Sequence, residues 1–264
     1  MTPLRVGEIP FLCAAPFYLG LAPAVAVRVA AAPRALGQLA RAGALDAAPL
    51  SAVDALALCA PGGGFVPLEQ AGAWLGIGAR GPVGSVLCFA SDPPERWHGR
   101  TVQVPPESAT SVRLLGWLLA RRGVRATLRE AGQAPLAGAA ARLLIGDAAL
   151  AARAAASPPP VVDLAEEWWR ATALPFVFGL WVARRDVAPE ARAALARALH
   201  AAARGVPAAA PALADAWRAR TGLTAPDLEA YLRGLRHVLG DDDRAGLHHF
   251  AAVLAHGAPN GIHP

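Results

Sequence analysis

Hydroxyl side chains gather at one place in this sequence where a strand is expected to give way to a helix. The segment PPESATS at residues 105–111 carries Ser108, Thr110 and Ser111 directly before an apolar run with helical spacing. The free backbone N–H groups at a helix start and the positive end of the helix dipole favour a bound anion by about 0.3–1 kcal/mol. The same hydroxyls could instead cap the helix, so the residues alone leave anion binding and capping open.

Ser85 is a second candidate for chemistry. It lies in VGSVL at residues 83–87, inside a β-branched apolar run of strand length. The run lacks the second glycine of the G-x-S-x-G nucleophile elbow, and no histidine stands near it in a recognisable pattern. A serine hydrolase is therefore not predicted. A strand hydroxyl that bonds the backbone is the structural alternative to a site residue.

Cys13 is the third candidate, a thiol in the middle of the uncharged segment GEIPFLCAAPFYLG at residues 7–20. The chain has three cysteines, Cys13, Cys59 and Cys88, and no C-x-x-C pair. An odd number of widely spaced cysteines predicts reduced thiols in a reducing compartment. We therefore expect a cytoplasmic protein.

The uncharged run around Cys13 extends over residues 9–27, which is long enough to raise the question of a membrane helix. Pro10, Pro16 and Pro23 interrupt it, and each removes a backbone donor and clashes with the preceding turn of a helix. Glu8 also lies where a signal peptide would carry positive charge. We expect neither a spanning helix nor a signal peptide.

The sequence GIGARG at residues 76–81 matches the letters of the dinucleotide fingerprint G-x-G-x-x-G. That fingerprint needs a helix directly after the glycines, so that the pyrophosphate meets a helix N-terminus. Pro82 and a strand-like run follow here instead. We expect a tight loop near a cleft and no nucleotide site.

The C-terminal region offers acidic and histidine side chains, but in patterns that do not predict a metal site. DDDRAG at residues 241–246 imitates the first half of an EF-hand loop, yet Ala252 stands where the bidentate glutamate belongs. We expect a solvated turn that caps the last helix. The spacing of the histidines closes no metal site, so we expect them on helix surfaces. These histidines are His237, His248, His249 and His256.

Composition excludes several classes of function. All 25 basic residues are arginine, and without lysine the chain cannot form a Schiff base with pyridoxal phosphate, build a phosphate-loop lysine or carry biotin. The net charge of +5 comes from arginines scattered singly or in pairs, without the stripe typical of nucleic-acid binding. A mildly basic protein that binds an anionic small molecule fits this distribution.

The elements that must position these side chains alternate between strand and helix. Strands are expected at residues 4–6, 28–30, 45–49, 83–89, 101–104, 142–147 and 174–182, and helices at 33–41, 54–58, 112–122 and 148–155, with mostly helix from 189 onward. This alternation is typical of an α/β fold with a mainly parallel sheet. We expect two lobes joined by two crossovers: residues 1–90 with 180–264, and an inserted lobe of 91–179.

Six stretches, in order along residues 4–185, resemble one family. They are GEIPFL at 7–12, GALDA at 43–47 with Ser51, GPVGS at 81–85, ATSVRL at 109–114, LIGDAAL at 144–150, and EW at 167–168 followed by LPFVF at 174–178. On these stretches the chain resembles the chorismate dehydratases of the futalosine route to menaquinone. The resemblance implies the two-lobed, type II fold of periplasmic solute-binding proteins, in a cytoplasmic enzyme. Each lobe would be a mixed sheet flanked by helices, with the ligand cleft between the lobes.

The resemblance also implies a reaction, the loss of water from chorismate to give 3-[(1-carboxyvinyl)oxy]benzoate. Aromatisation drives this reaction, so the protein mainly has to orient the ring, hold two carboxylates and assist departure of the hydroxyl. No metal or other cofactor is expected. The expected partner is a small dicarboxylate like chorismate, with neither nucleic acid nor membrane.

Site residues follow from the same resemblance. Ser85 matches the family's active-site serine, with a hydrogen bond to substrate near the departing hydroxyl as its implied role. Thr110 and Ser111 would hold a carboxylate, and Ser51 is a further binding group. The matching stretches also place three more residues at the expected substrate site: Gly84, Ala109 and Asp147.

Cys13 departs from the family pattern. The family usually has an asparagine at this point, implicated in catalysis, and an amide offers two donors and an acceptor where a thiol offers only a weak donor and a weak acceptor. Two alternatives to a dehydratase stay open. One is a binding protein that kept the clamp and lost the chemistry. The other is an enzyme of dihydroxynaphthoate formation, although GPVGS and LIGDAAL favour the dehydratase.

Overall fold

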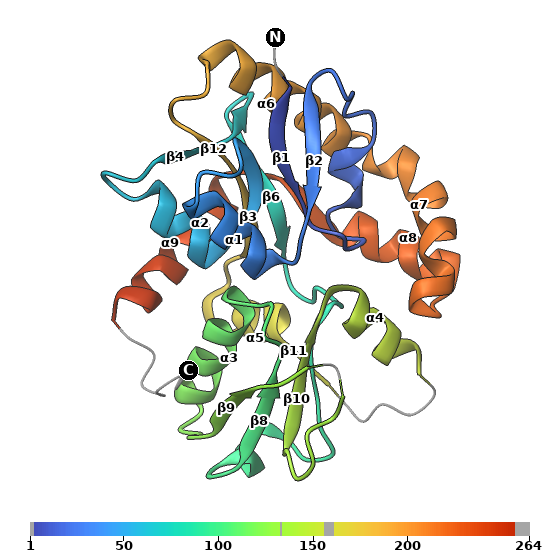
Figure 1. Ribbon diagram of the computed structural model, residues 1–264. Helices are drawn as coiled ribbons and strands as arrows, with labels where there is room; N and C mark the ends of the chain where they lie inside the picture. Colours follow the sequence, from blue (N-terminus) through green and yellow to red (C-terminus); the bar gives the residue numbers. More distant parts are fainter. Residues whose placement is uncertain (1–2, 133, 156–160, 257–264) are drawn as a thin grey trace.

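The computed structural model describes residues 3–132, 134–155 and 161–256, and it contains two mixed sheets, one in each of two lobes (Figure 1). The first sheet contains β1 (Leu4–Glu8), β2 (Ala26–Ala30), β3 (Ala47–Ser51), β4 (Phe65–Pro67), β5 (Glu69–Gln70), β6 (Ala73–Ala79), β12 (Phe176–Arg184) and β13 (Leu235–Leu239). The second contains β7 (Val86–Phe89), β8 (Thr101–Val104), β9 (Thr127–Glu130), β10 (Ala141–Ile145) and β11 (Val161–Asp163).

Both sheets combine parallel and antiparallel neighbours. In the first, with the order β13-β6-β12-β3-β1-β2, β1 runs parallel to β2 and β3, while β12 runs antiparallel to β3 and β6. In the second, with the order β11-β7-β10-β8-β9, β8 runs parallel to β9 and β10, while β7 runs antiparallel to β10. The expected α/β fold with a mixed sheet in each lobe is confirmed. The mainly parallel pairing expected from the alternation of strands and helices is wrong, because most neighbouring strands run antiparallel.

Helices flank both sheets (Figure 1). Those of the first lobe are α1 (Pro33–Arg41), α2 (Ala52–Cys59), α6 (Pro189–Arg204), α7 (Val206–Thr221), α8 (Ala225–Gly234) and α9 (Asp241–Ala255). Those of the second are α3 (Thr110–Arg121), α4 (Gly146–Ala154) and α5 (Leu164–Thr172). Two short 3-10 helices, η1 (Ala15–Tyr18) and η2 (Pro94–Trp97), complete the described elements.

The chain crosses between the lobes at slightly different points from those expected. Strand pairing puts β7 in the second sheet and the start of β12 in the first, so the crossovers precede β7 and β12 instead of falling at residues 90 and 180. The turn after β6 depends on Gly81 and Gly84, whose φ angles of +82° and +72° only glycine adopts easily. At the second crossover α5 ends at Ala173, in the left-handed conformation. The expected crossovers at residues 90 and 180 were displaced because an apolar run of sequence does not show at which residue a turn interrupts it.

The GIGARG motif forms part of strand β6, so the tight loop expected for it is wrong. β6 lies between β13 and β12. A Cβ atom on Gly76 would lie 2.4 Å from the carbonyl oxygen of Gly179, and one on Gly78 would lie 3.1 Å from that of Phe176. These glycines therefore permit close approach of β12 rather than binding of a phosphate.

The C-terminal region is mainly helical, as expected, but it also supplies β13, which no pattern predicted. His237 lies on β13 with only 4% of its surface exposed, so its expected place on a helix surface is wrong; His248, His249 and His256 are exposed. The DDDRAG segment opens α9 and is not simply a solvated turn. Asp243 is fully buried and accepts two hydrogen bonds of 2.6 Å from Arg236.

The uncharged segment after β1 forms a loop, η1 and the start of β2 rather than one continuous helix. Phe17 and Tyr18 of η1 pack near Trp181 of β12, with ring centroids 5.5 and 6.1 Å apart. The segment is therefore a wall of the first lobe's core. Among the described residues, none of the helices combines the length and apolar character needed to cross a bilayer.

Aromatic rings join the two lobes beside the second crossover. Trp168 of α5 is fully buried, and its ring lies 5.2 Å from Phe176 of β12 and 6.0 Å from Phe250 of α9. On the second lobe's side it lies 4.9 Å from Trp117 of α3. Because such pairs contribute about 0.5–1.5 kcal/mol each beyond their burial, this cluster fixes the second lobe against the first.

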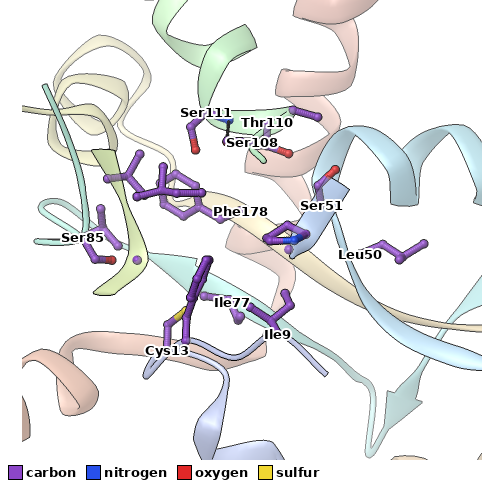
Figure 2. A pocket seen from close by; sticks show the side chains of 18 residues that line it. Ile9, Cys13, Leu50, Ser51, Ile77, Ser85, Ser108, Thr110, Ser111 and Phe178 are labelled. Atoms are coloured by element: carbon purple, nitrogen blue, oxygen red, sulfur yellow. Dashed lines mark hydrogen bonds between the residues drawn. The ribbon is translucent and has the colours of Figure 1, made fainter. Parts of the chain in front are cut away.

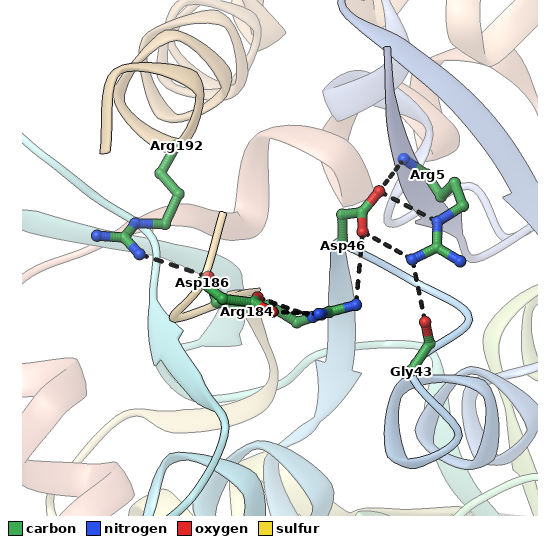
Figure 3. A network of polar contacts seen from close by, with 6 residues as sticks. All are labelled: Arg5, Gly43, Asp46, Arg184, Asp186 and Arg192. Carbon is green, nitrogen blue, oxygen red and sulfur yellow. Dashed lines mark hydrogen bonds and ion pairs between the residues drawn. The ribbon is translucent and has the colours of Figure 1, made fainter. Parts of the chain in front are cut away.

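An ion-pair network holds the ends of three strands of the first sheet (Figure 3). Asp46, just before β3, accepts from the backbone N of Arg5 on β1 at 2.7 Å and from its guanidinium at 2.8 Å. Arg184 at the end of β12 lies 3.9 Å from the same carboxylate and pairs with Asp186. Hydrogen bonds from Arg5 hold the pKa of Asp46 below its usual value. Exposed pairs of this kind contribute at most about 1 kcal/mol each.

Replacing Gly76 with alanine tests the close contact between β6 and β12. We expect Gly76→Ala to lower the free energy of unfolding by about 2–4 kcal/mol, because its Cβ meets backbone that cannot move aside. Urea denaturation followed by circular dichroism measures it. Gly234→Ala is the matched control, since a Cβ there meets nothing within 4 Å. Equal stability of the two variants would contradict the packing described.

Candidate functional site

A pocket between the lobes collects the hydroxyl and thiol side chains singled out in the sequence (Figure 2). Its empty volume is about 630 Å³, including space open to solvent, which is within the usual range of ligand pockets. Its polar lining residues are Cys13, Ser51, Ser85, Ser108, Thr110 and Ser111. Its larger apolar lining residues are Ile9, Phe11, Leu50, Ile77, Val83, Val86, Ile145 and Phe178. None of the described lining residues is charged, so the pocket offers a ligand its shape and neutral hydrogen-bonding groups.

The start of α3 contributes three hydroxyls. The sequence left open whether they cap the helix or face an anion, and the structure shows both arrangements. Ser108 caps the helix, because its Oγ accepts a hydrogen bond of 3.2 Å from the backbone N of Ser111. The hydroxyls of Thr110 and Ser111 lie on the pocket side of the helix start (Figure 2). Thr110 also accepts a hydrogen bond of 3.2 Å from the backbone N of Val53 in the first lobe. The helix start is therefore both capped and available to an anion in the cleft.

Ser51 ends β3 and caps α2, and its hydroxyl proton is already committed. Its Oγ accepts from the backbone N of Asp54 at 3.2 Å and donates to the Asp54 carboxylate at 2.7 Å. Asp54 is 5% exposed and is paired with Arg41 at 2.5 Å. Because a carboxylate accepts only, Ser51 meets a ligand as an acceptor. Gly37 makes room for the pair, since a Cβ there would lie 2.6 Å from the Asp54 carboxylate.

Ser85 sits just before β7, in the turn that crosses between the lobes, and not inside a strand. Its carbonyl accepts from the backbone N of Gly146 at 2.8 Å, and its Oγ receives a hydrogen bond of 2.9 Å from Tyr231. Gly84 is not among the residues that line the pocket. Its backbone N instead donates to Asp163 at 2.7 Å, which fixes the turn that presents Ser85.

Asp163 supports the Ser85 turn from the second lobe. One of its oxygens accepts from Gly84, and the other caps α5 by accepting from the backbone N of Ala165 and of Glu166 at 3.0 and 3.2 Å. Burial raises the pKa of Asp163 from its usual value, and these backbone N–H groups oppose the shift. The group therefore positions the turn by hydrogen bonds to its carboxylate.

Cys13 lines the pocket from the first lobe and stays a thiol. Burial raises its pKa to about 12, and the negative charge of Asp147 adds to the shift, so the thiolate is not populated near neutral pH. Its carbonyl accepts a hydrogen bond of 2.8 Å from Nε2 of His237. Burial lowers the pKa of His237, which leaves a neutral ring whose Nε2 carries the donated proton. The position of Cys13 is thus fixed by a strand that the sequence did not predict.

Asp147 does not line the pocket, and its contacts give it a different place from the one expected. One oxygen accepts from the backbone N of Leu12 at 2.9 Å. The other accepts from Nε1 of Trp217 at 3.1 Å and pairs with Arg220 at 2.9 Å. The carboxylate therefore ties α4 of the second lobe to α7 and to the segment of the first lobe that carries Cys13.

Sequence reasoning missed several residues that shape the site. Asp54 follows Ser51 by three positions, the spacing of a helix-capping pair, and that signal could have found it. Tyr231 comes 146 positions after Ser85, and no local pattern connects the two. Gly146 has a φ angle of +58°, and a Cβ there would lie 2.8 Å from the ring of Phe11, a constraint that appears only in three dimensions.

The histidine and acidic residues of the C-terminal region do not assemble into a metal site. Within residues 3–132, 134–155 and 161–256, the structure brings together no group of three histidine, cysteine or acidic side chains able to hold a metal ion. Asp243 is instead committed to Arg236 and to the start of α9.

Comparisons with known proteins agree with this architecture. A family model described as menaquinone biosynthesis matches residues 4–256. A protein of Thermus thermophilus named chorismate dehydratase is 37% identical over 174 residues, which is 60% of this chain and 64% of that protein. The match thus spans somewhat less than two thirds of the relative's length.

Solved structures share the fold at low sequence identity. A protein of Archaeoglobus fulgidus superimposes with a TM-score of 0.76 at 18% identity, covering 97% of both chains. The periplasmic aliphatic sulphonate binding protein of Escherichia coli gives 0.68 at 15% identity, over 97% of this chain and 87% of that one. The alkanesulfonate-binding protein of Xanthomonas axonopodis gives 0.70 at 13% identity, over 97% and 93%. The expected periplasmic-binding-protein fold is confirmed.

The thiol of Cys13 should be nearly inert toward alkylating reagents. With its pKa raised to about 12, the thiolate fraction at pH 8 falls about a thousandfold below that of a thiol with a pKa of 9.0, and it rises again only as the pH approaches 12. Iodoacetamide labelling followed by mass spectrometry measures this, with the urea-unfolded protein as the control. Labelling of Cys13 in the native protein as fast as in urea would contradict the burial described.

Removing the Asp147 carboxylate should loosen the contact between the lobes. We expect Asp147→Ala to lower the free energy of unfolding by about 2–4 kcal/mol, because three donors lose their acceptor. Asp215→Ala is the control, since that carboxylate is 68% exposed and pairs on the surface with Arg218. Urea titrations in which both variants lose the same small amount would show that Asp147 does not brace the lobes.

Proposed function

Because the chain belongs to the menaquinone biosynthesis family, we propose that it is a chorismate dehydratase. The proposed reaction removes water from chorismate to give 3-[(1-carboxyvinyl)oxy]benzoate, which makes the protein a carbon–oxygen lyase. The name of the relative from Thermus thermophilus supports this substrate. The protein would act in the cytoplasm on the futalosine route.

The observation that carries the proposal is the convergence of residues from separate stretches on one pocket. Of the eight residues that the resemblance assigns to the site, six line the pocket between the lobes. They are Cys13, Ser51, Ser85, Ala109, Thr110 and Ser111. Their positions range over about a hundred residues of sequence, so the fold brings residues of several family stretches together at one pocket.

The character of the pocket fits a flat ring with two carboxylates. Ile9, Ile77 and Phe178 offer apolar walls for the ring. The start of α3, with Thr110 and Ser111, offers backbone N–H groups and hydroxyls to one carboxylate. Since the lining carries no charge, affinity for the dianion would come from oriented dipoles rather than ion pairs.

The chemistry asks little of the protein beyond orientation. A proton leaves the ring carbon that bears the enolpyruvyl ether, hydroxide leaves the neighbouring carbon, and the two combine as water while the ring becomes aromatic. Ser85 would donate a hydrogen bond to a substrate oxygen that gains charge on the way. Cys13 stays protonated because of its raised pKa, so we assign it no role as a base.

The direct test incubates the purified protein with chorismate and follows the enolpyruvyl benzoate by chromatography. We expect turnover above the uncatalysed background, and a loss of about 10²–10³-fold in kcat for Ser85→Ala, because a preorganised donor is removed. Ser91→Ala, at an exposed position outside the pocket, is the matched control. A shift in melting temperature with chorismate but no product would support a binding protein instead.

A second variant addresses the thiol. Cys13→Asn supplies the amide usual in the family at a position that lines the pocket. An amide adds donors that a thiol lacks, so we expect kcat to rise severalfold over the wild type. Cys59→Asn, outside the pocket, is the control. A fall in kcat for Cys13→Asn alone would show that the pocket is adapted to the thiol.

A further inference from the structure

Tyr231 brings a second hydroxyl to Ser85 from the far end of the chain. It lies on α8, and its OH is 2.9 Å from the Oγ of Ser85. Both residues are buried, with 7% of Tyr231 and 3% of Ser85 exposed. A buried phenol usually keeps its hydroxyl bonded to a specific partner, and here that partner is the proposed active-site serine.

The surroundings of Tyr231 give this hydrogen bond a direction. Its hydroxyl is the donor, and the Oγ of Ser85 is the acceptor. Burial raises the pKa of Tyr231 well above its usual value, so the hydroxyl keeps its single proton. That proton is donated to the Oγ of Ser85. The proton of Ser85 itself is then free to point into the pocket.

The ring of Tyr231 is also held in place beside the turn that carries Ser85. A Cβ atom on Gly84 would lie 3.9 Å from the ring and 2.7 Å from the guanidinium of Arg153. Leu228 and Leu232 on α8 are fully buried, so the helix that carries the ring is anchored in the core. The tyrosine therefore has little freedom to turn its hydroxyl elsewhere.

We propose that Tyr231 is a positioning residue that fixes Ser85 as a hydrogen-bond donor toward the ligand. The inference rests on the proposed function only for its kinetic test. It assigns to the C-terminal helix α8 a part in the site. Without the tyrosine, the serine proton would be free to turn away from the ligand.

The kinetic test compares the only two tyrosines of the chain. Tyr231→Phe removes the hydroxyl next to Ser85, and we expect kcat on chorismate to fall about tenfold with KM changed less than about threefold. Tyr18→Phe is the matched control, because Tyr18 is also buried and accepts a hydrogen bond of 3.0 Å from the backbone N of Ile9. Both variants should lower the melting temperature by similar amounts, but only the first should lower kcat.

A double-mutant cycle separates positioning from general damage. In a Ser85→Ala background the tyrosine has no serine to orient, so Tyr231→Phe should reduce kcat by less than about twofold further. A further tenfold loss in that background would overturn the proposal. Unchanged kcat for the single variant Tyr231→Phe would overturn it as well.

A spectroscopic test does not depend on turnover. With tyrosine labelled by ¹³C at the ζ carbon, the protein gives two resonances, since it has only two tyrosines. Ser85→Ala should shift the Tyr231 resonance and leave that of Tyr18 in place. If chorismate is not a substrate, this shift still supports the hydrogen bond between Tyr231 and Ser85 while the proposed function fails. No shift would overturn the positioning role of Tyr231 whatever the substrate is.

Discussion

The carboxylate of Asp147 is the contact on which the rest of the site depends. It lies at the start of α4 in the second lobe, and it binds Leu12, Trp217 and Arg220 of the first. Leu12 precedes Cys13, so this side chain joins the lobes next to a pocket wall, in addition to the contact of Trp168 between the lobes and that of His237 with Cys13. Gly146, next to it, receives the ring of Phe11 in a space that no side chain could share. The pocket is a consequence of how these two short segments meet.

The pocket lining is uncharged, and two carboxylates lie directly behind it. Asp54 lies behind Ser51, and Asp163 lies behind the turn that carries Ser85. Each fixes a hydroxyl or a turn without meeting the ligand. This arrangement suits a reaction driven by aromatisation, because the protein then has to orient a ring and its leaving group more than to supply an acid or a base. It also gives the two serines opposite hydrogen-bonding roles toward a ligand, with Ser51 as an acceptor and Ser85 as a donor.

The sequence was most informative where function depends on local stretches. The strand before Ser51, the hydroxyl-rich start of α3 and the strand before Asp147 were all found from local patterns. The two lobes were expected from the order of the elements, and the resemblance added the type of fold. What could not be found depends on distant contacts. Gly76 and Gly78 lie in a strand because β12 approaches closely, and β13 exists because it pairs with β6. Tyr231 reaches Ser85 only through the fold. Asp147 was expected beside the ligand because it lies in a stretch that matches the family. In the structure its carboxylate accepts a hydrogen bond from Leu12 and does not line the pocket.

A crystal structure of the protein with 3-[(1-carboxyvinyl)oxy]benzoate bound would test the proposed site. We expect the ring between Ile9 and Phe178, one carboxylate at Thr110 and Ser111, and a ligand oxygen within hydrogen-bond distance of Ser85. A product bound elsewhere on the surface, or held in the pocket with its carboxylates away from the start of α3, would contradict it.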